Sequence, residues 1–216
     1  MICLENVGKK FFKHHVLSKI NLKLNSSDRI AIIGGNGAGK TTLFRCLLGH
    51  YTHQGNITIF GRNARRNRVE LLKDVGFVPQ IPPPIQMTVE ELINFNLSIS
   101  DTVTKDDIFS VASDLKLDIL EHQKKPFFKF SGGMQQKLLI ALALAKKPKL
   151  LVLDEPAANL DPYGREIFFE RLQEIPKETI VLLTSHRVNE VKNFVNRVIE
   201  MDCGNVIGDQ RFEVIK

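Results

Sequence analysis

Cysteine is scarce in this sequence. Only three cysteines occur among the 216 residues, Cys3, Cys46 and Cys203, and they lie far apart with no C-x-x-C pair. This usage argues against both a disulfide framework and a zinc site, because each needs cysteines in a recognisable set of spacings. A reducing compartment is the setting that we expect.

Long apolar runs are also missing. The stretch from Leu138 to Ala145 is among the longest, and a membrane-spanning helix needs roughly 20 apolar residues. No basic-then-apolar leader opens the chain. We therefore expect a chain that is soluble by itself, with any membrane-spanning partner on a separate chain. Internal repeats and low-complexity segments are absent too, which favours a single binding site per chain.

Basic residues outnumber acidic residues, so the formal net charge is +6 and the pI is near 9.2. The densest basic cluster consists of Arg62, Arg65, Arg66 and Arg68. No aromatic residues are interleaved there to stack on bases, which makes nucleic acid an unfavoured partner. A solvated face is one interpretation of the cluster, and contact with a membrane surface or a partner is the other.

A phosphate-binding loop stands out among the features that are present. Residues 34–42 follow the apolar run Arg29–Ile33 and fit the pattern G-x-x-x-x-G-K-[ST]. Glycines let backbone amides face the phosphates, and the helix opening at Lys40 adds the positive end of its dipole. We expect Lys40 to reach the β- and γ-phosphates, Thr41 to give its hydroxyl to Mg²⁺ and Thr42 to face the α-phosphate. The rest of the cradle comprises Gly34, Gly35, Asn36, Gly37, Ala38 and Gly39.

Two acids end a later apolar strand, Leu151–Leu153. A carboxylate at the C-terminal end of a strand lies where α/β sheets bind their ligands. Asp154 is suited to hold Mg²⁺ through water, and Glu155 to polarise the water that attacks the phosphate.

A second glycine-rich segment, Ser131-Gly132-Gly133, opens a long helical run. Exposed amides at a helix N-terminus form an anion site. One chain with two phosphate-directed segments and one lysine-bearing cradle suggests a symmetric dimer, in which each segment completes the site of the other copy.

Apolar patterning predicts alternating strands and helices, hence a parallel α/β sheet. The expected strands are Ile2–Val7, Val16–Leu24, Arg29–Ile33, Asn56–Phe60, Val75–Val78, Leu150–Asp154, Thr179–Thr184 and Arg197–Met201. The expected helices run from Lys40 to about His50, over Arg65–Lys73 and over Arg187–Val195, with helix alone from about Gln86 to Ala145. Capping-box patterns at Thr88 and Thr104 support the helical insertion.

The order of these motifs resembles the ATP-binding cassette (ABC) ATPases, the nucleotide-binding subunits of ABC transporters, over nearly the whole chain. Phe130–Met134 is similar to the signature sequence of that family, with Phe for the usual Leu and Met where Gln is common. The signature separates this family from other P-loop NTPases, so it is the most discriminating match.

The resemblance implies roles for four further residues. Phe11 resembles the aromatic residue that stacks on adenine, although Phe12 is adjacent and open to the same role. Gln80 resembles the glutamine that contacts Mg²⁺ and the attacking water and senses the transmembrane partner. Asp161 resembles the aspartate that supports communication across the dimer, and His186 the histidine that contacts the γ-phosphate.

The resemblance also implies a fold: a P-loop NTPase with a RecA-like parallel-sheet core, an N-terminal antiparallel β subdomain and an inserted helical subdomain. We expect one domain over residues 1–216, with the core and β subdomain in 1–85 and 146–216 and the helical subdomain in 86–145. The implied cofactors are ATP and Mg²⁺. The implied partners are an integral membrane transporter subunit and a second ATPase subunit, identical or different, on the cytoplasmic face of the membrane.

Two other functions compete with this hypothesis. A soluble cassette protein that acts on ribosomes or nucleic acid would suit the basic charge, but such proteins usually carry two cassettes or long coiled-coil insertions. A P-loop kinase or GTPase would leave Ser131–Gly133 and His186 unexplained, and an N-K-x-D motif is absent. The transported substrate and its direction stay open, because the membrane subunit decides both in this family.

Overall fold

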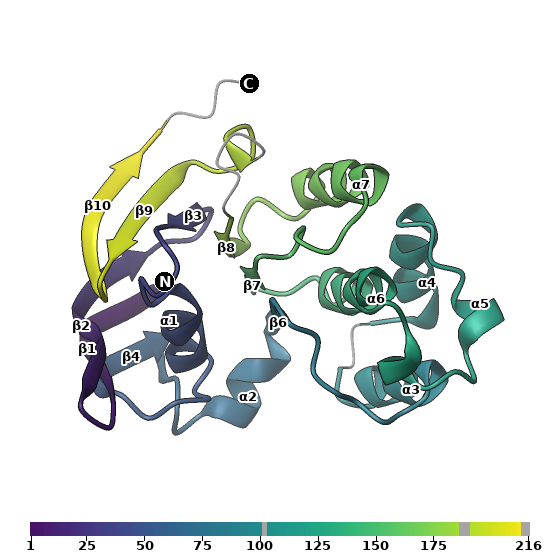
Figure 1. The fold of residues 1–216 in the computed structure, drawn as a ribbon, viewed down its shortest axis with the longest axis horizontal. Coiled ribbons are helices and arrows are strands. Elements are labelled where there is room, and N and C mark those ends of the chain that lie inside the picture. The colour runs from purple at the N-terminus through teal and green to yellow at the C-terminus, as the bar shows by residue number, and fades with distance from the viewer. Residues whose placement is uncertain (101–102, 186–190, 213–216) are drawn as a thin grey trace.

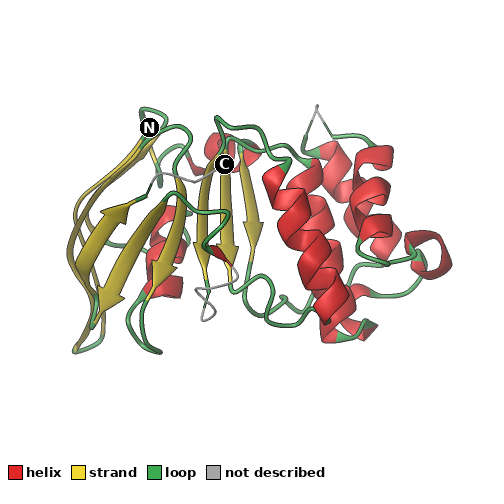
Figure 2. Cartoon of the chain, turned by 90° about the horizontal axis from the view of Figure 1, so that it is seen from above, coloured by secondary structure: helices red, strands yellow, loops and turns green. Residues whose placement is uncertain are grey.

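The computed structural model describes residues 1–100, 103–185 and 191–212. Strands fill two adjoining sheets at one end of the molecule, and helices fill the other end (Figures 1 and 2). The predicted mixed α/β class is confirmed, including an antiparallel sheet built from the N-terminal part of the chain.

The larger sheet has six strands in the order β10-β9-β3-β8-β7-β6. Its strands are β3 (Arg29–Ile33), β6 (Val75–Val78), β7 (Leu150–Asp154), β8 (Ile180–Thr184), β9 (Arg197–Asp202) and β10 (Asn205–Arg211). Neighbours pair in parallel except β10, which runs antiparallel to β9. β7 and β8 are buried at every residue, as apolar runs covered on both faces must be.

The smaller sheet is antiparallel, in the order β2-β1-β4-β5. It consists of β1 (Ile2–Phe11), β2 (His14–Leu24), β4 (Gln54–Ile59) and β5 (Arg62–Asn63). The two predicted N-terminal strands pair with each other as expected, but both are longer than predicted, because irregularities in the register let the ladder continue past Val7.

Helix α1 (Lys40–Leu47) packs between the two sheets (Figure 1). Its buried Leu43 and Phe44 join one core with Ile2 of β1 and Ile30 of β3. The predicted end near His50 was too late, because Gly49 adopts a left-handed φ of 68° that stops the helix. This packing holds the start of α1, and with it the phosphate loop, against both sheets.

The helical insertion is confirmed, and it has a hydrophobic core of its own. Its helices are α3 (Val89–Ser98), α4 (Lys105–Asp114), α5 (Ile119–His122) and α6 (Gly132–Ala145), with the short 3₁₀ turn η1 (Phe127–Lys129) before α6. Both predicted capping boxes form, at Thr88 with Glu91 and at Thr104 with Asp107. No helix within the described ranges is both long and apolar enough to cross a membrane.

Within the described ranges, α2 and α7 also lie outside the insertion. α2 (Arg68–Lys73) begins three residues later than predicted, because the Asn63 side-chain oxygen accepts hydrogen bonds from the amides of Arg65 and Arg66 and holds them in a turn. α7 (Pro162–Gln173) was not predicted. The predicted helix Arg187–Val195 falls largely outside the described residues.

The capping box of α4 makes the stability of the protein depend on pH. Hydrogen bonds from the Thr104 hydroxyl, then Lys147 and the Thr104 amide, lower the pKa of Asp107 to about 2. A carboxyl whose pKa is lowered by folding stabilises the protein above its unfolded pKa, which is about 3.9, and loses that effect as the pH falls through its folded pKa. The Asp107→Asn variant should therefore be less stable than the wild type at pH 6, with a difference that shrinks between about pH 4 and pH 2.

Urea unfolding at a series of pH values measures this difference. A gap between the two proteins that stays constant from pH 6 down to pH 3 would contradict the assigned pKa shift.

Candidate functional site

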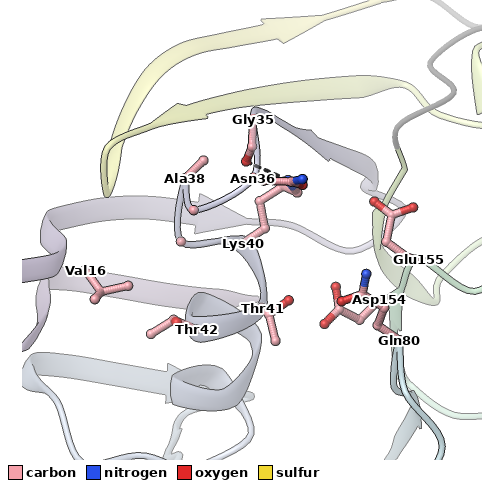
Figure 3. A pocket seen from close by; sticks show the side chains of 12 residues that line it. Val16, Gly35, Asn36, Ala38, Lys40, Thr41, Thr42, Gln80, Asp154 and Glu155 are labelled. Carbon is pink, nitrogen blue, oxygen red and sulfur yellow. Dashed lines mark hydrogen bonds between the residues drawn. The ribbon is translucent and has the colours of Figure 1, made fainter. Parts of the chain in front are cut away.

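The phosphate loop and the two acids line one cavity of about 200 Å³. Figure 3 shows the loop at the start of α1 facing residues from the C-terminal ends of β6 and β7. The lining residues are Val16, Gly35, Asn36, Gly37, Ala38, Gly39, Lys40, Thr41, Thr42, Gln80, Asp154 and Glu155. Segments separated by more than a hundred residues thus meet where a parallel sheet places its ligands.

Lys40 is the cation of this cavity. Its side chain folds back over the loop, and its ammonium group donates to the backbone oxygens of Gly34 and Gly35 at 2.7 and 3.1 Å (Figure 3). Lys40 is only 8% exposed. A buried cation with carbonyl partners alone is well placed to exchange them for the oxygens of a phosphate, which carries a full charge.

Two glycines of the loop are required by their surroundings. A Cβ on Gly34 would lie 2.1 Å from the backbone oxygen of Met201, and one on Gly39 would lie 2.8 Å from that of Val16. Both also have φ values in the left-handed range, 148° and 103°. The loop therefore approaches β9 and β2 so closely that only glycine fits at these two positions.

Asp154 and Glu155 stand at the end of β7, held by Thr184 of the neighbouring strand. The Thr184 hydroxyl donates to Asp154 Oδ1 and accepts from the Glu155 amide, both at 2.8 Å. Thr184 is fully buried and Asp154 is 2% exposed. Glu155 has a φ of 48°, a conformation that costs energy for a residue with a Cβ and that often marks functional sites. One hydroxyl thus orients both acids.

Replacing Thr184 with Val keeps the shape of the side chain but removes this hydroxyl. A displacement of about 1 Å at a reacting group costs up to about a hundredfold in rate, so we expect kcat for ATP hydrolysis to fall at least about tenfold. Thr179→Val is the matched control, because Thr179 is equally buried and donates to the Pro148 oxygen away from the cavity. Steady-state ATPase kinetics with a thermal melt for each variant make the comparison, and equal kcat values in the two variants would refute the role of Thr184.

Several predicted site residues are not among those that line this cavity. Ser131 and Gly132 are exposed at the start of α6, and neither they nor Gly133 line the cavity. Asp161 is the N-cap of α7, where its carboxylate accepts from the Gly164 amide at 2.8 Å. His186 lies outside the described residues.

Neither of the two candidates for stacking on adenine, Phe11 and Phe12, lines the cavity. The Phe11 ring packs edge-on against Tyr51 with ring centroids 5.2 Å apart, whereas Phe12 is fully exposed at the turn between β1 and β2. Phe11 and Phe12 both stay predictions for this role.

Sequence reasoning missed Val16, which lines the cavity, and Thr184. Val16 carries no chemical signal in the sequence. Thr184 does, because its hydroxyl directly follows the apolar run Ile180–Leu183.

A glycine-rich loop between a parallel strand and a helix, with a buried lysine facing two strand-end acids, defines a P-loop nucleoside triphosphatase. Comparisons with known proteins narrow this class. A family model described as ABC transporter matches residues 17–158. The energy-coupling factor transporter ATP-binding protein EcfA2 of Clostridium perfringens is 33% identical over 95% of this chain and 76% of its own length. The bacitracin transport ATP-binding protein BcrA of Bacillus licheniformis is 33% identical over 98% of this chain and 70% of its own.

The fold has a close match among solved structures. A dimeric ATP-binding cassette in a post-hydrolysis state with ADP and Pi superposes with a TM-score of 0.86 at 22% identity, covering 99% of both chains. The chain belongs to the ABC transporter family. It is the ATP-binding, ATP-hydrolysing subunit, and the predicted family, fold and ATPase activity are confirmed.

Proposed function

We propose that this subunit works as a dimer in which two chains enclose two ATP molecules, and that closing and reopening of the dimer drives a membrane-spanning partner. One observation carries the proposal: Ser131 and Gly132 are exposed, and the segment Ser131–Gly133 is absent from the cavity formed by its own phosphate loop. A helix N-terminus with free amides is an anion site. A two-fold axis would bring that segment of each copy onto the ATP held by the other.

The cavity also suits Mg²⁺. Thr41, Gln80 and Asp154 line it together, and they offer a hydroxyl, an amide oxygen and a carboxylate, which are the oxygen ligands that this ion prefers. When bound, Mg²⁺ would neutralise charge on the phosphates. We propose these three residues as its holders, with Asp154 acting through water.

The remaining roles are those that the resemblance to the family implies. Lys40 and the amides of residues 35–42 would bind the phosphates, and Glu155 would accept a proton from the attacking water. Gln80 would orient that water, and His186 would contact the γ-phosphate. Phe11 or Phe12 would stack on adenine. In the partner copy, Ser131, Gly132, Gly133 and Asp161 would complete the site.

We further propose that residues 86–145 act as a helical subdomain against a core of 1–85 and 146–216, which the separate hydrophobic core of α3–α6 supports. The subunit would sit on the cytoplasmic face of a membrane, bound to an integral membrane transporter subunit. The names of the relatives point to different transporters, energy-coupling factor and bacitracin, so we assign no transported substrate.

Affinity purification of the tagged chain from gently solubilised membranes of its native host, followed by mass spectrometry, tests the proposal. A multi-spanning protein recovered in stoichiometric amount is the expected result, and it would identify the transporter. Recovery of ribosomal proteins or nucleic acid instead would favour the soluble-cassette alternative.

A further inference from the structure

One face of α6 lies against the loop that follows Glu155. Gly133, Gln136 and Lys137 are spaced i, i+3 and i+4, so they share that face. Opposite them is the segment 156–161, which connects the catalytic end of β7 to α7. Each of the three residues meets this connecting segment in a different way.

Gln136 contacts the start of the connecting segment. The residue is completely buried, and its Nε2 donates to the backbone oxygen of Pro156 at 3.0 Å. Pro156 directly follows Glu155, so this hydrogen bond fixes the backbone one residue beyond the catalytic acid. A buried amide of this kind is costly to leave without its partner, which makes the contact specific.

Lys137 contacts the end of the segment. Its ammonium group pairs with Asp161 Oδ2 at 2.9 Å, while Oδ1 of the same carboxylate caps α7 through the Gly164 amide. The Lys137 side chain is only 12% exposed. Gly164 leaves room for the lysine, because a Cβ there would lie 3.3 Å from Lys137 Cε.

Gly133 contacts the middle of the segment. A Cβ at this position would lie 3.0 Å from the backbone oxygen of Asn159, whereas a Cβ on Gly132 would meet nothing within 4 Å. The two adjacent glycines therefore differ: Gly133 is needed for packing within its own chain, and Gly132 is not.

We propose that Gln136 and Lys137 are positioning residues that, with Gly133, tie the start of α6 to the loop carrying Glu155. The inference rests on the proposed function of Glu155. Glu155 is held from two sides, by Thr184 through its amide and by α6 through Pro156 and Asp161. Loss of the contacts from α6 should therefore displace the segment 156–161, and Glu155 with it.

Lys137→Met tests this inference, because it keeps the length of the side chain and removes the ion pair. We expect kcat for ATP hydrolysis to fall about tenfold with KM for ATP within about twofold, since Lys137 does not line the cavity. Lys137→Arg restores a cation and should recover most of kcat. Lys147→Met is the matched control, because Lys147 pairs with Asp107 at 3.0 Å just beyond the other end of α6.

Thermal melts and a Glu155→Gln variant complete the experiment. A purely structural role would lower the melting temperature without separating kcat from KM, and arginine would not selectively rescue kcat. If Lys137→Met keeps the wild-type kcat while Glu155→Gln is inactive, this inference is overturned and the proposed function is not. An active Glu155→Gln would instead overturn the proposed function. If Lys137→Met fails to fold, Lys137→Gln removes the same charge with a polar side chain, and the same loss of kcat is expected.

Discussion

Replacing Glu155 with Gln should lower kcat for ATP hydrolysis by about 10²- to 10³-fold and leave ATP binding intact, because positioned general bases contribute rate accelerations of this size. Glutamine has nearly the same shape and keeps the backbone hydrogen bond to Thr184. It lacks the carboxylate that we propose as the acceptor of the proton from the attacking water. ATP then stays uncleaved.

The same variant should accumulate as a dimer when ATP is added, because ATP that is not cleaved keeps the two composite sites closed. Size-exclusion chromatography with light scattering, with and without ATP, measures the population of the dimer. Glu200→Gln is the matched control, since Glu200 is exposed on β9 and does not line the cavity. A Glu155→Gln protein that remains monomeric in saturating ATP would count against the proposed dimer.

Replacing Arg197 with Met should have the largest effect on stability, a loss of about 3 kcal/mol or more in the free energy of unfolding. The guanidinium group is buried and pairs with Asp28 at 2.9 Å and with Asp209 at 2.7 Å. It also donates to the backbone oxygen of Lys23 at 2.8 Å. Removing it would leave Asp28, whose side chain is only 3% exposed, without its buried partner.

Arg211→Met is the internal control for this prediction. Arg211 also pairs with Asp28, at 2.8 Å, but its side chain is 53% exposed. Because half of the Arg211 side chain is exposed to water and Arg197 still pairs with Asp28 in this variant, the loss should be much smaller. Urea unfolding curves of the two variants decide the matter. Equal losses in the free energy of unfolding would mean that burial does not decide how much each ion pair of Asp28 contributes to stability.

The sequence predicted some elements to the residue. β6 (Val75–Val78) and β7 (Leu150–Asp154) have the predicted limits, because each is a short apolar run bounded by prolines or charged residues. α7 escaped prediction because its buried Phe168 and Leu172 are separated by charged residues and make a weak stripe. The signal that was available is Asp161 followed by Pro162, an N-cap with proline at the first helical position.

β10 escaped prediction for a different reason. Its residues, Asn205–Arg211, are mostly polar and exposed. They form a strand because they pair with β9, because Asp209 bonds to Arg197 of that strand, and because Arg211 bonds to Asp28, which lies 183 positions away in the sequence. Local pattern carries no information about such partners.

By itself, the sequence determined the family of this protein and predicted where its chemistry lies, through the glycine-rich loop with Lys40, the acids that end β7, and the signature segment that separates the family from other P-loop proteins. These are local patterns, and each residue type is demanded by its immediate task. Only the tertiary structure decided which side chains hold that chemistry in place. Thr184 orients both acids, and Gln136 and Lys137 reach the loop beyond Glu155. Such contacts join residues about twenty or thirty positions apart, and they exist only once sheet and helices have packed, so a local pattern can mark a residue such as Thr184 as unusual but cannot show which residues it joins.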